Sequence, residues 1–277
     1  MEHETKQYVV ELDAASCITP GRRFFENITL KLEPGKILCV VGASGGGKSA
    51  LCGVAAGLSL PTSGAARLLG RDTASCIYAD TQKLRMRIGY VFQRSALIAN
   101  MTIAENVALP LLYHTSLARE EIEKKIAGLL DVLEIRDIAD ARPAGLPEVT
   151  VQRANLARAL ALDPEVLFFD EPIEDTGFGR HIKKILKPFL KNLAKEKNVG
   201  IFMVSRDPHF AYRTADRIGF MEDGVLVEEG TVEEIKIPEK TSRIGLLRAQ
   251  SDRQGKGSAP DGENPPDEKT EEDNNKN

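Results

Sequence analysis

The sequence predicts an α/β fold with a mainly parallel β-sheet, and three observations support this. Short apolar runs without polar alternation indicate strands that are buried on both faces. The clearest runs are Ile37–Val41, Val166–Phe169 and Val199–Val204. Stretches with helical periodicity separate them. A glycine-rich segment joins the first of these strands to a helix-compatible stretch at Ala50–Ala56, an arrangement typical of α/β nucleotide-binding proteins.

Two apolar stripes predict amphipathic helices. Between Glu120 and Leu133, apolar residues recur at intervals of four, three, one and three. A similar stripe runs between Ile182 and Leu193. Pro188 lies inside the second stripe and is expected to kink or split that helix, because proline lacks the N–H that an interior helical position donates.

Strand-like patterns also occur near both ends of the apolar part of the chain. Tyr8–Leu12 and Ile28–Leu32 are the N-terminal candidates. Ile218–Met221 and Val225–Glu228 flank Asp223-Gly224, a pair of residues that favours a two-residue hairpin turn.

The charge distribution separates a neutral body from an acidic tail. The 277 residues carry a net charge of −4, and residues 251–277 contain eight acidic and four basic residues, which leaves 33 of each in the first 250. One Ala is the only apolar residue in 251–277, so this segment is expected to be disordered. A neutral body argues against a dedicated nucleic-acid-binding protein.

Membrane insertion and secretion are not expected from the sequence. No run approaches 18 apolar residues, and the N-terminus lacks a basic flank followed by an apolar segment. The four cysteines form no close pair along the chain, which indicates reduced thiols in the cytoplasm.

Residues 42–49 carry the pattern of a phosphate-binding loop, in which two glycines five positions apart precede Lys and Ser. A buried strand leads into the segment and a helix follows, so backbone N–H groups can converge on phosphate at the helix N-terminus. Lys48 is expected to reach the β- and γ-phosphates and Ser49 to bind Mg²⁺. A chance glycine-rich turn is the alternative. The predicted nucleotide-binding residues are Gly42, Ala43, Ser44, Gly45, Gly46, Gly47, Lys48 and Ser49.

The strand at Val166–Phe169 ends in two carboxylates. Asp170 is expected to hold Mg²⁺ through its water shell, and Glu171 to orient and deprotonate an attacking water. Two acids that follow a strand usually lie in a solvated loop, but the phosphate loop in the same chain favours the catalytic interpretation.

In order and spacing, these motifs resemble those of the nucleotide-binding subunits of ABC transporters, over about residues 7–235. Residues 91–117 are most similar to the Mla/Mce-associated lipid transporters of Gram-negative bacteria. The landmarks besides the phosphate loop are Gly64, Tyr90-Val91-Phe92-Gln93, Ala154–Leu160, Asp170-Glu171-Pro172 and Ala215-Asp216-Arg217-Ile218.

The resemblance implies a P-loop NTPase core with a mainly parallel sheet, an antiparallel β subdomain and an α-helical subdomain, and it implies ATP and Mg²⁺ as ligands. The chain is expected to divide into a flexible N-terminus at 1–6, an ATPase domain at 7–237 with its helical subdomain at about 94–160, an extension at 238–250 and the acidic tail at 251–277.

The resemblance also implies a membrane permease as partner, at the cytoplasmic face of the inner (plasma) membrane, and dimerisation with an identical or a different ATPase subunit. Gln93 is implied to contact Mg²⁺ or the attacking water and to link the nucleotide to the permease; a surface glutamine after a strand is the alternative. No nucleic-acid partner is expected. Related DNA-repair and chromosome ATPases carry coiled coils or zinc cysteines, and related translation factors carry two such domains.

The five-residue family signature, usually Leu-Ser-Gly-Gly-Gln, aligns with residues 146–150, where only Leu146 is retained. In the family this segment donates hydrogen bonds to the γ-phosphate bound by the opposite subunit. Pro147 has no N–H to donate, and Val149 cannot approach as closely as glycine. Glu148 would repel phosphate, since two unit charges about 4 Å apart at a dielectric of about 20 interact by roughly 4 kcal/mol. Pro and Glu nevertheless suit the first turn of a helix, so a helix is still expected here.

Two further positions depart from the family. Arg206 replaces the switch histidine, and because a guanidinium only donates hydrogen bonds, we expect it to bind the γ-phosphate. An exposed arginine paired with Asp207 or Asp216 is the alternative. The D-loop aspartate of the family falls at Gly177, and Asp175 is the nearest substitute.

The aromatic residue that stacks on adenine in the family has no counterpart here. Cys17 or Ile18 occupies that region, while Phe24 and Phe25 are expected in the core of a strand. Together the departures predict ATP binding with slow or partner-dependent hydrolysis, with Glu171, Gln93 and Arg206 at the catalytic site. The alternative is a non-hydrolysing, nucleotide-responsive scaffold or regulatory subunit of the same permease complex.

Overall fold

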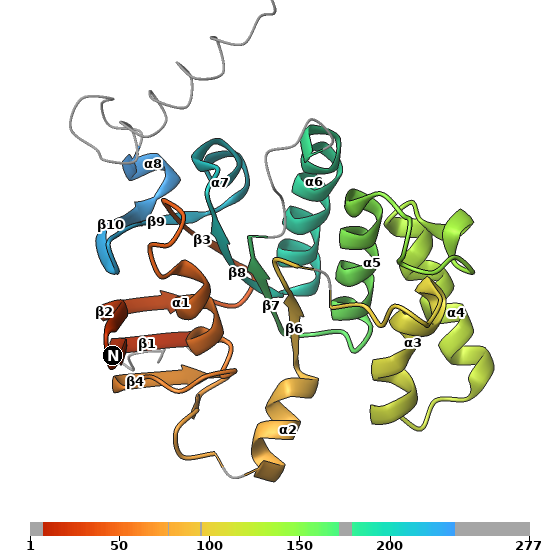
Figure 1. The fold of residues 1–277 in the computed structure, drawn as a ribbon, viewed down its shortest axis with the longest axis horizontal. Coiled ribbons are helices and arrows are strands. Elements are labelled where there is room, and N and C mark those ends of the chain that lie inside the picture. Colours follow the sequence, from red (N-terminus) through yellow and green to blue (C-terminus); the bar gives the residue numbers. More distant parts are fainter. Residues whose placement is uncertain (1–7, 77, 95, 172–178, 236–277) are drawn as a thin grey trace, which may run out of the picture.

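A six-stranded sheet forms the centre of the fold, as the buried apolar runs predict (Figure 1). The computed structural model describes residues 8–76, 78–94, 96–171 and 179–235. The strand order is β10-β9-β3-β8-β7-β6, and all neighbours are parallel except β9 and β10, which form the antiparallel hairpin predicted around Asp223-Gly224. The strands are β3 Ile37–Gly42, β6 Ile88–Val91, β7 Val166–Asp170, β8 Gly200–Ser205, β9 Arg217–Glu222 and β10 Val225–Thr231.

Both faces of this sheet are covered, which explains why its strands lack polar alternation. All six residues of β3 are buried. Ile37, Cys39 and Val41 pack into one apolar cluster, together with residues of α3 to α7. Leu38 and Val40 pack into a second cluster that contains residues of α1, β1 and β2.

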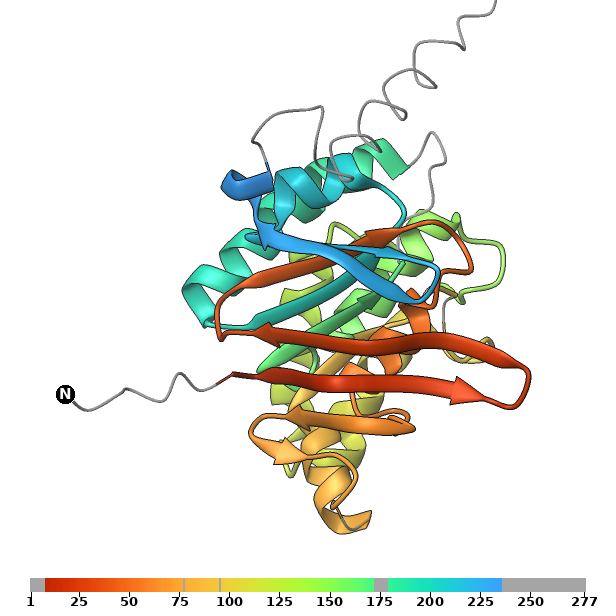
Figure 2. The same ribbon diagram turned by 90° about the vertical axis from the view of Figure 1, so that its left-hand side faces the viewer.

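The second sheet is antiparallel, with the strand order β2-β1-β4-β5 (Figure 2). Its two long strands extend well beyond the predicted segments and contain bulges, at which the pairing register shifts. Phe24 and Phe25 both lie in β2, and the Phe25 side chain is fully buried, as expected of strand core. The strands are β1 Val10–Thr19, β2 Arg22–Leu32, β4 Ser63–Leu68 and β5 Arg71–Asp72.

The structure confirms the two helices that were predicted from apolar stripes. The stripe at 120–133 forms α4, which lies beside α3 and α5 on the side of the molecule opposite β1, β2 and β4 (Figure 1). Within the described ranges, no helix has the length and apolarity needed to cross a membrane. The helices are α1 Lys48–Ala55, α2 Tyr78–Met86, α3 Ile103–His114, α4 Arg119–Val132, α5 Glu148–Leu160, α6 Gly179–Lys197, α7 Pro208–Thr214 and α8 Val232–Ile235, with a 3₁₀ turn at Arg136–Ile138.

Pro188 was expected to kink or split its helix, and the helix is not split, because α6 continues through that position. Pro188 is exposed on the outer side of the helix. Leu186, Leu190 and Leu193 are buried in the cluster beneath the sheet. This burial on the inner side of α6 outweighs the one backbone hydrogen bond that proline cannot make.

Candidate functional site

The predicted phosphate loop joins β3 to α1, between a fully buried strand and the N-terminus of a helix. Gly45 and Gly47 have positive φ angles of 80° and 90°, which favour glycine. A Cβ atom at Gly47 would lie 1.8 Å from the Phe24 carbonyl oxygen of β2. The loop therefore needs glycine at position 47 both for its backbone conformation and for its contact with the antiparallel sheet.

Lys48 lies at the start of α1 and is almost completely buried, with 3% of its surface exposed. Its Nζ atom donates to the Ala43 carbonyl oxygen at 2.8 Å, inside the phosphate loop. The same Nζ lies 2.7 Å from Oε1 of Glu171. A buried ammonium group requires such partners, because the loss of its hydration is otherwise strongly unfavourable.

Glu171 follows β7 directly and is 8% exposed. Its backbone has a φ angle of 44°, in the left-handed region that non-glycine residues rarely adopt. Three side chains surround its carboxylate: Lys48 at 2.7 Å, Arg206 at 3.1 Å from Nε to Oε2, and Gln93 at 3.4 Å from Nε2 to Oε2. The structure thus brings Gln93, Arg206 and the predicted lysine together at the carboxylate of Glu171.

Asp170, at the last position of β7, carries the feature that best fits a metal ion. Its Oδ1 atom is buried and has no hydrogen-bond partner, while Oδ2 accepts from the Tyr90 hydroxyl at 3.4 Å. Burial raises the pKa of Asp170 above its ordinary value, and a hydrogen bond with the Ser49 side chain opposes this rise. A bound divalent cation would supply the missing partner of Oδ1.

Asp170 and Ser49 therefore fit the protein side of a Mg²⁺ site. Among the described residues, no three His, Cys, Asp or Glu side chains form a cluster that could hold a metal ion. Mg²⁺ commonly binds through one or two protein ligands together with substrate phosphates and water. The donor set found here is of this kind. Tyr90 was not predicted as part of the site, although it belongs to the Tyr-Val-Phe-Gln landmark.

Arg206 lies in the turn between β8 and α7, and the adjacent residue Asp207 stabilises this turn. The Asp207 side chain accepts from the backbone N–H groups of His209 and Phe210 and so caps α7. The Asp216 side chain accepts from the Ile37 N–H at the far end of β3. Arg206 forms an ion pair with Glu171, a partner that the sequence did not predict.

Gln93 is connected to α5 as well as to Glu171. Its carbonyl oxygen accepts from Nε2 of Gln152 at 3.0 Å, and Gln152 is buried on α5. This helix begins at Glu148 with Pro147 at its N-cap, so the expected helix after the altered signature is confirmed. Gln152 was not predicted, because no pattern in the sequence connects it to position 93.

Two other predicted regions have different outcomes. The D-loop positions Gly177 and Asp175 lie outside the described residues. At the adenine region, Ile18 is 42% exposed near the end of β1. On β2, the Arg22 guanidinium lies 4.5 Å from the centre of the Phe24 ring.

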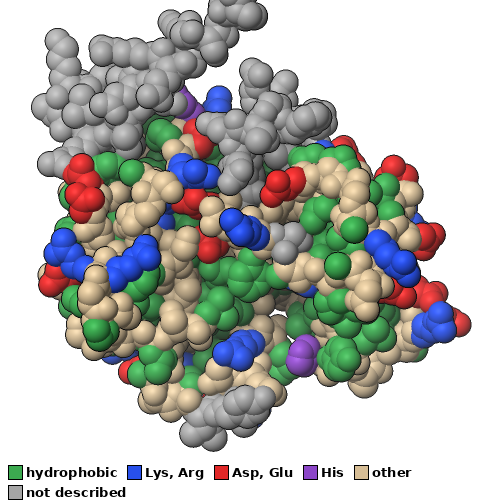
Figure 3. Space-filling model, in the orientation of Figure 1, with side chains coloured by type: hydrophobic (Ala, Val, Ile, Leu, Met, Phe, Trp, Pro, Cys, Tyr) green, Lys and Arg blue, Asp and Glu red, His purple; other side chains and the backbone are tan. Residues whose placement is uncertain are grey.

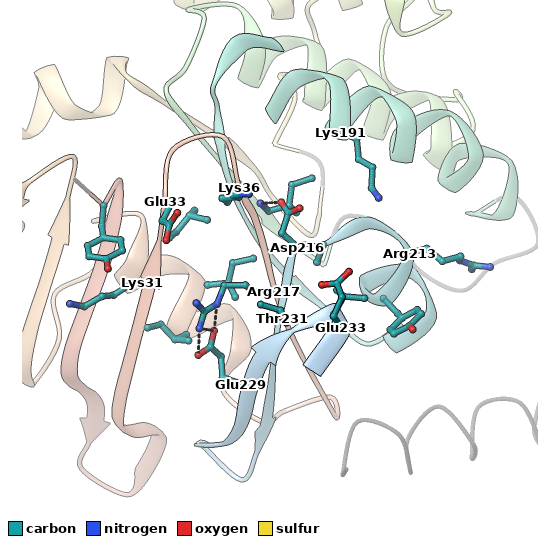
Figure 4. A pocket seen from close by; sticks show the side chains of 18 of the residues that line it. Lys31, Glu33, Lys36, Lys191, Arg213, Asp216, Arg217, Glu229, Thr231 and Glu233 are labelled. Atoms are coloured by element: carbon teal, nitrogen blue, oxygen red, sulfur yellow. Dashed lines mark hydrogen bonds and ion pairs between the residues drawn. The ribbon is translucent and has the colours of Figure 1, made fainter. Parts of the chain in front are cut away.

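A cavity of about 710 Å³ lies at the N-terminal end of β3, near its first residues (Figure 4). Its wall contains the Arg217–Glu229 ion pair, and Lys191 reaches toward it from α6. The phosphate loop follows the last residue of β3, at the other end of the same strand. This cavity is therefore separate from the residues around Glu171.

The family of the chain follows from a sequence comparison. The family described as "ABC transporter" matches residues 25–174, which include the phosphate loop, Gln93, Asp170 and Glu171. The chain belongs to the ABC transporter family. The fold described above is accordingly that of an ABC ATPase, with its parallel and antiparallel sheets and its helices.

Several members of the ABC transporter family are similar over most of this chain. The methionine import ATP-binding protein MetN of Haemophilus influenzae is 35% identical, over 78% of this chain and 62% of its own length. The intermembrane phospholipid transport system ATP-binding protein MlaF of the same species is 29% identical, over 89% of this chain and 92% of its own length. The similarity to lipid transporters expected from residues 91–117 is therefore shared with importers of other cargoes.

A solved structure agrees with this assignment. The ATP-binding cassette MJ0796, in a dimeric post-hydrolysis state bound to ADP and Pi, superposes with a TM-score of 0.72 at 28% identity. The superposition covers 80% of this chain and 98% of the cassette. The described fold is thus that of an ATP-binding cassette, while the chain spans 62% of the length of MetN.

Proposed function

We propose that this protein is the ATP-binding subunit of an ABC transporter and that it binds Mg-ATP at the phosphate loop, with slow or partner-dependent hydrolysis. One observation carries the proposal: the loop lysine Lys48 and the strand-end carboxylate Glu171 lie 2.7 Å apart beside the unpartnered Oδ1 of Asp170. A phosphate-binding lysine, a metal-binding carboxylate and a carboxylate that can act as general base therefore lie in one place.

Each residue of the site has a role in this proposal. The N–H groups of residues 42–49 and Lys48 hold the phosphates, and Ser49 and Asp170 hold Mg²⁺ with Gln93 nearby. Bound Mg²⁺ supplies positive charge to the β- and γ-phosphate oxygens. Glu171 accepts the proton of the attacking water, which is a role suited to a carboxylate within hydrogen-bond reach.

Slow hydrolysis follows from the residues that face a partner subunit in the family arrangement. Residues Pro147, Glu148 and Val149 replace the signature donors, and Arg206 replaces the switch histidine. The loss of one preorganised donor to a transition state typically lowers a rate by about 100- to 1000-fold. In a homodimer both sites have these changes, whereas a different partner subunit could supply one intact signature.

The proposed partner is a membrane permease at the cytoplasmic face of the inner membrane. Hydrophobic side chains gather over α3 on the face shown in Figure 3. Exposed apolar patches of this kind mark interaction sites. The large exposed apolar residues on α3 or close to it in the chain are Ile98, Leu112, Tyr113 and Leu117.

For the cargo, we propose phospholipid. MlaF, whose name specifies intermembrane phospholipid transport, aligns with this chain over 92% of its own length. Residues 91–117, which follow Gln93 and include α3, supply the second argument because they resemble lipid transporters. Copurification with a permease and a lipid-binding protein encoded by neighbouring genes would support this cargo, and copurification with a methionine permease would contradict it.

Calorimetry with Mg-ATP tests nucleotide binding. The native chain should release or absorb heat on binding, and Lys48→Ala should weaken affinity at least about tenfold, because a charge-assisted contact to phosphate is lost. The matched control is Lys36→Ala, an exposed lysine in the far cavity, which should bind like the native chain. Equal affinity of Lys48→Ala and the native chain would contradict the proposal.

A second candidate is a nucleotide-responsive scaffold that clamps the permease without hydrolysis. The altered signature at the start of α5 and the replaced histidine favour it. Glu171→Gln separates the two functions, because it removes the proton acceptor but keeps the side-chain volume. Transport in cells should be lost in the first case and retained in the second, with immunoblots to verify equal amounts of protein.

A further inference from the structure

Two cationic side chains, Lys48 and Arg206, contact the Glu171 carboxylate. Lys48 contacts Oε1, while Arg206 contacts Oε2, and the Gln93 amide lies near the same oxygen. The Lys48–Glu171 pair is buried, with side-chain exposures of 2% and 8%. Arg206 is 42% exposed at its side chain, so solvent reaches this arm of the cluster.

The position of the carboxylate overlaps with the expected place of a terminal phosphate. In a phosphate loop the lysine reaches the β- and γ-phosphates. In this structure the Lys48 ammonium contacts a Glu171 oxygen at 2.7 Å, the distance at which it would hold a phosphate oxygen. One ammonium can approach both anions at this distance only if they lie beside each other, where they repel.

We propose that Arg206 exchanges one anionic partner for another when nucleotide binds. Without nucleotide, Arg206 and Lys48 hold the Glu171 carboxylate against the phosphate loop. When a nucleoside triphosphate binds, its terminal phosphate takes over both cations, and Glu171 is released toward the attacking water. The inference rests on the proposed nucleotide site. It adds that Glu171 competes with the terminal phosphate for the same two cations, so the affinity of the site for a triphosphate is reduced as long as Lys48 and Arg206 hold Glu171.

This competition should affect the binding of triphosphates and diphosphates differently. A diphosphate does not place a third phosphate among Glu171, Lys48 and Arg206, so it should compete little with the carboxylate. A triphosphate must displace the carboxylate. Removal of the Glu171 charge should therefore increase affinity for the triphosphate and leave affinity for the diphosphate nearly unchanged.

A double-mutant cycle on nucleotide affinity tests the exchange. The probes are a non-hydrolysable ATP analogue and ADP, both with Mg²⁺, at protein concentrations at which light scattering reports monomer only. Glu171→Gln should tighten binding of the analogue about tenfold and change ADP affinity less than about twofold. Arg206→Gln should weaken analogue binding about tenfold in the Glu171→Gln chain, but only about twofold when Glu171 is present.

Arg213→Gln is the matched control, because Arg213 is an exposed arginine that lines the far cavity, and it should change neither affinity. Equal effects of Arg206→Gln in both backgrounds, or equal effects of Glu171→Gln on the analogue and on ADP, would overturn the exchange. Failure of the native chain to bind either nucleotide would instead overturn the proposed function. Since Arg206 is partly exposed, its variant is expected to fold even if Glu171→Gln does not.

Discussion

At the scale of single residues, two glycines of the phosphate loop have different requirements. The glycine at position 47 combines a left-handed backbone with a contact that leaves no room for a methyl group. Gly45 has a similar φ angle, but a Cβ atom there would meet nothing within 4 Å. The two glycines therefore separate the effect of backbone strain from the effect of a steric clash.

We expect Gly47→Ala to destabilise the chain much more than Gly45→Ala. The left-handed conformation alone costs about 1–2 kcal/mol for alanine, and this should be the whole effect at position 45. At position 47 the clash with the Phe24 carbonyl should raise the loss to more than about 4 kcal/mol, which is rare for a single substitution. Urea unfolding measures both free energies of unfolding. Equal losses of stability would show that β2 shifts enough to accommodate the added methyl group.

The cysteines provide a second test at this scale. Cys39 and Cys52 are fully buried, and burial raises the pKa of both thiols, so little reactive thiolate is present near neutral pH. Cys17 and Cys76 are only half-buried. A thiol reagent at pH 8 should modify Cys17 and Cys76 at least about tenfold faster than the buried pair, as followed by peptide mass spectrometry. Rapid modification of all four in the folded chain would contradict the described packing.

At the scale of elements, the C-terminal ends of three neighbouring strands place the predicted catalytic residues close to one another. Strands β6, β7 and β8 are parallel neighbours, so Gln93, Glu171 and Arg206 follow the same edge of the sheet. The loop after Gln93 is held from α3, where the buried Asn106 side chain bonds to backbone groups of Ile98, Met101 and Thr102. Strand order and one buried amide thus position residues that lie far apart in the sequence.

Pro188 gives a prediction for α6. Because the helix continues through this position and the residue is exposed, Pro188→Ala restores a backbone donor without disturbing the buried leucines. We expect the free energy of unfolding to rise by about 1–3 kcal/mol. Lys191→Ala, another exposed position of α6, serves as the control and should change stability by less than about 0.5 kcal/mol. A lower stability of Pro188→Ala would mean that α6 requires the proline.

The sequence predicted several strands and helices and the local motifs, because their signals lie within short segments, whereas α2, α3 and β4 were not predicted. The phosphate loop needs only the spacing of residues 42–49, and the buried strands need only their composition. The ion pair between Arg206 and Glu171 could not be predicted, since it depends on β7 lying beside β8. The continuation of α6 through Pro188 likewise depends on tertiary burial, which outweighs the local preference.

At the scale of the whole molecule, net charge distinguishes residues 1–250 from residues 251–277. Residues 1–250 carry 33 acidic and 33 basic residues, so the net charge of −4 comes from residues 251–277. Those residues lie outside the described part of the chain. Molecules with a net charge near zero associate more readily, and the proposed role of the tail is to keep the protein soluble.

Removal of residues 251–277 should therefore lower solubility near pH 7 and leave the free energy of unfolding within about 0.5 kcal/mol of the native value. A control in which an uncharged Gly/Ser segment of equal length replaces the tail should precipitate like the truncated chain. Ammonium sulfate precipitation and urea unfolding provide the two measurements. A large loss of stability on truncation would show that the tail packs against the body.

The hydrogen bond from Gln152 to the Gln93 carbonyl has a mechanical consequence. Helix α5 begins at Glu148 and reaches Gln152 one turn later, and the Gln93 side chain lies within 3.4 Å of Glu171. A neighbouring protein that contacts the first turn of α5 would therefore lie only two hydrogen bonds away from the Glu171 carboxylate. In the proposed function, this short connection joins the outer surface of α5 to the residue that activates water, and it bypasses the central sheet.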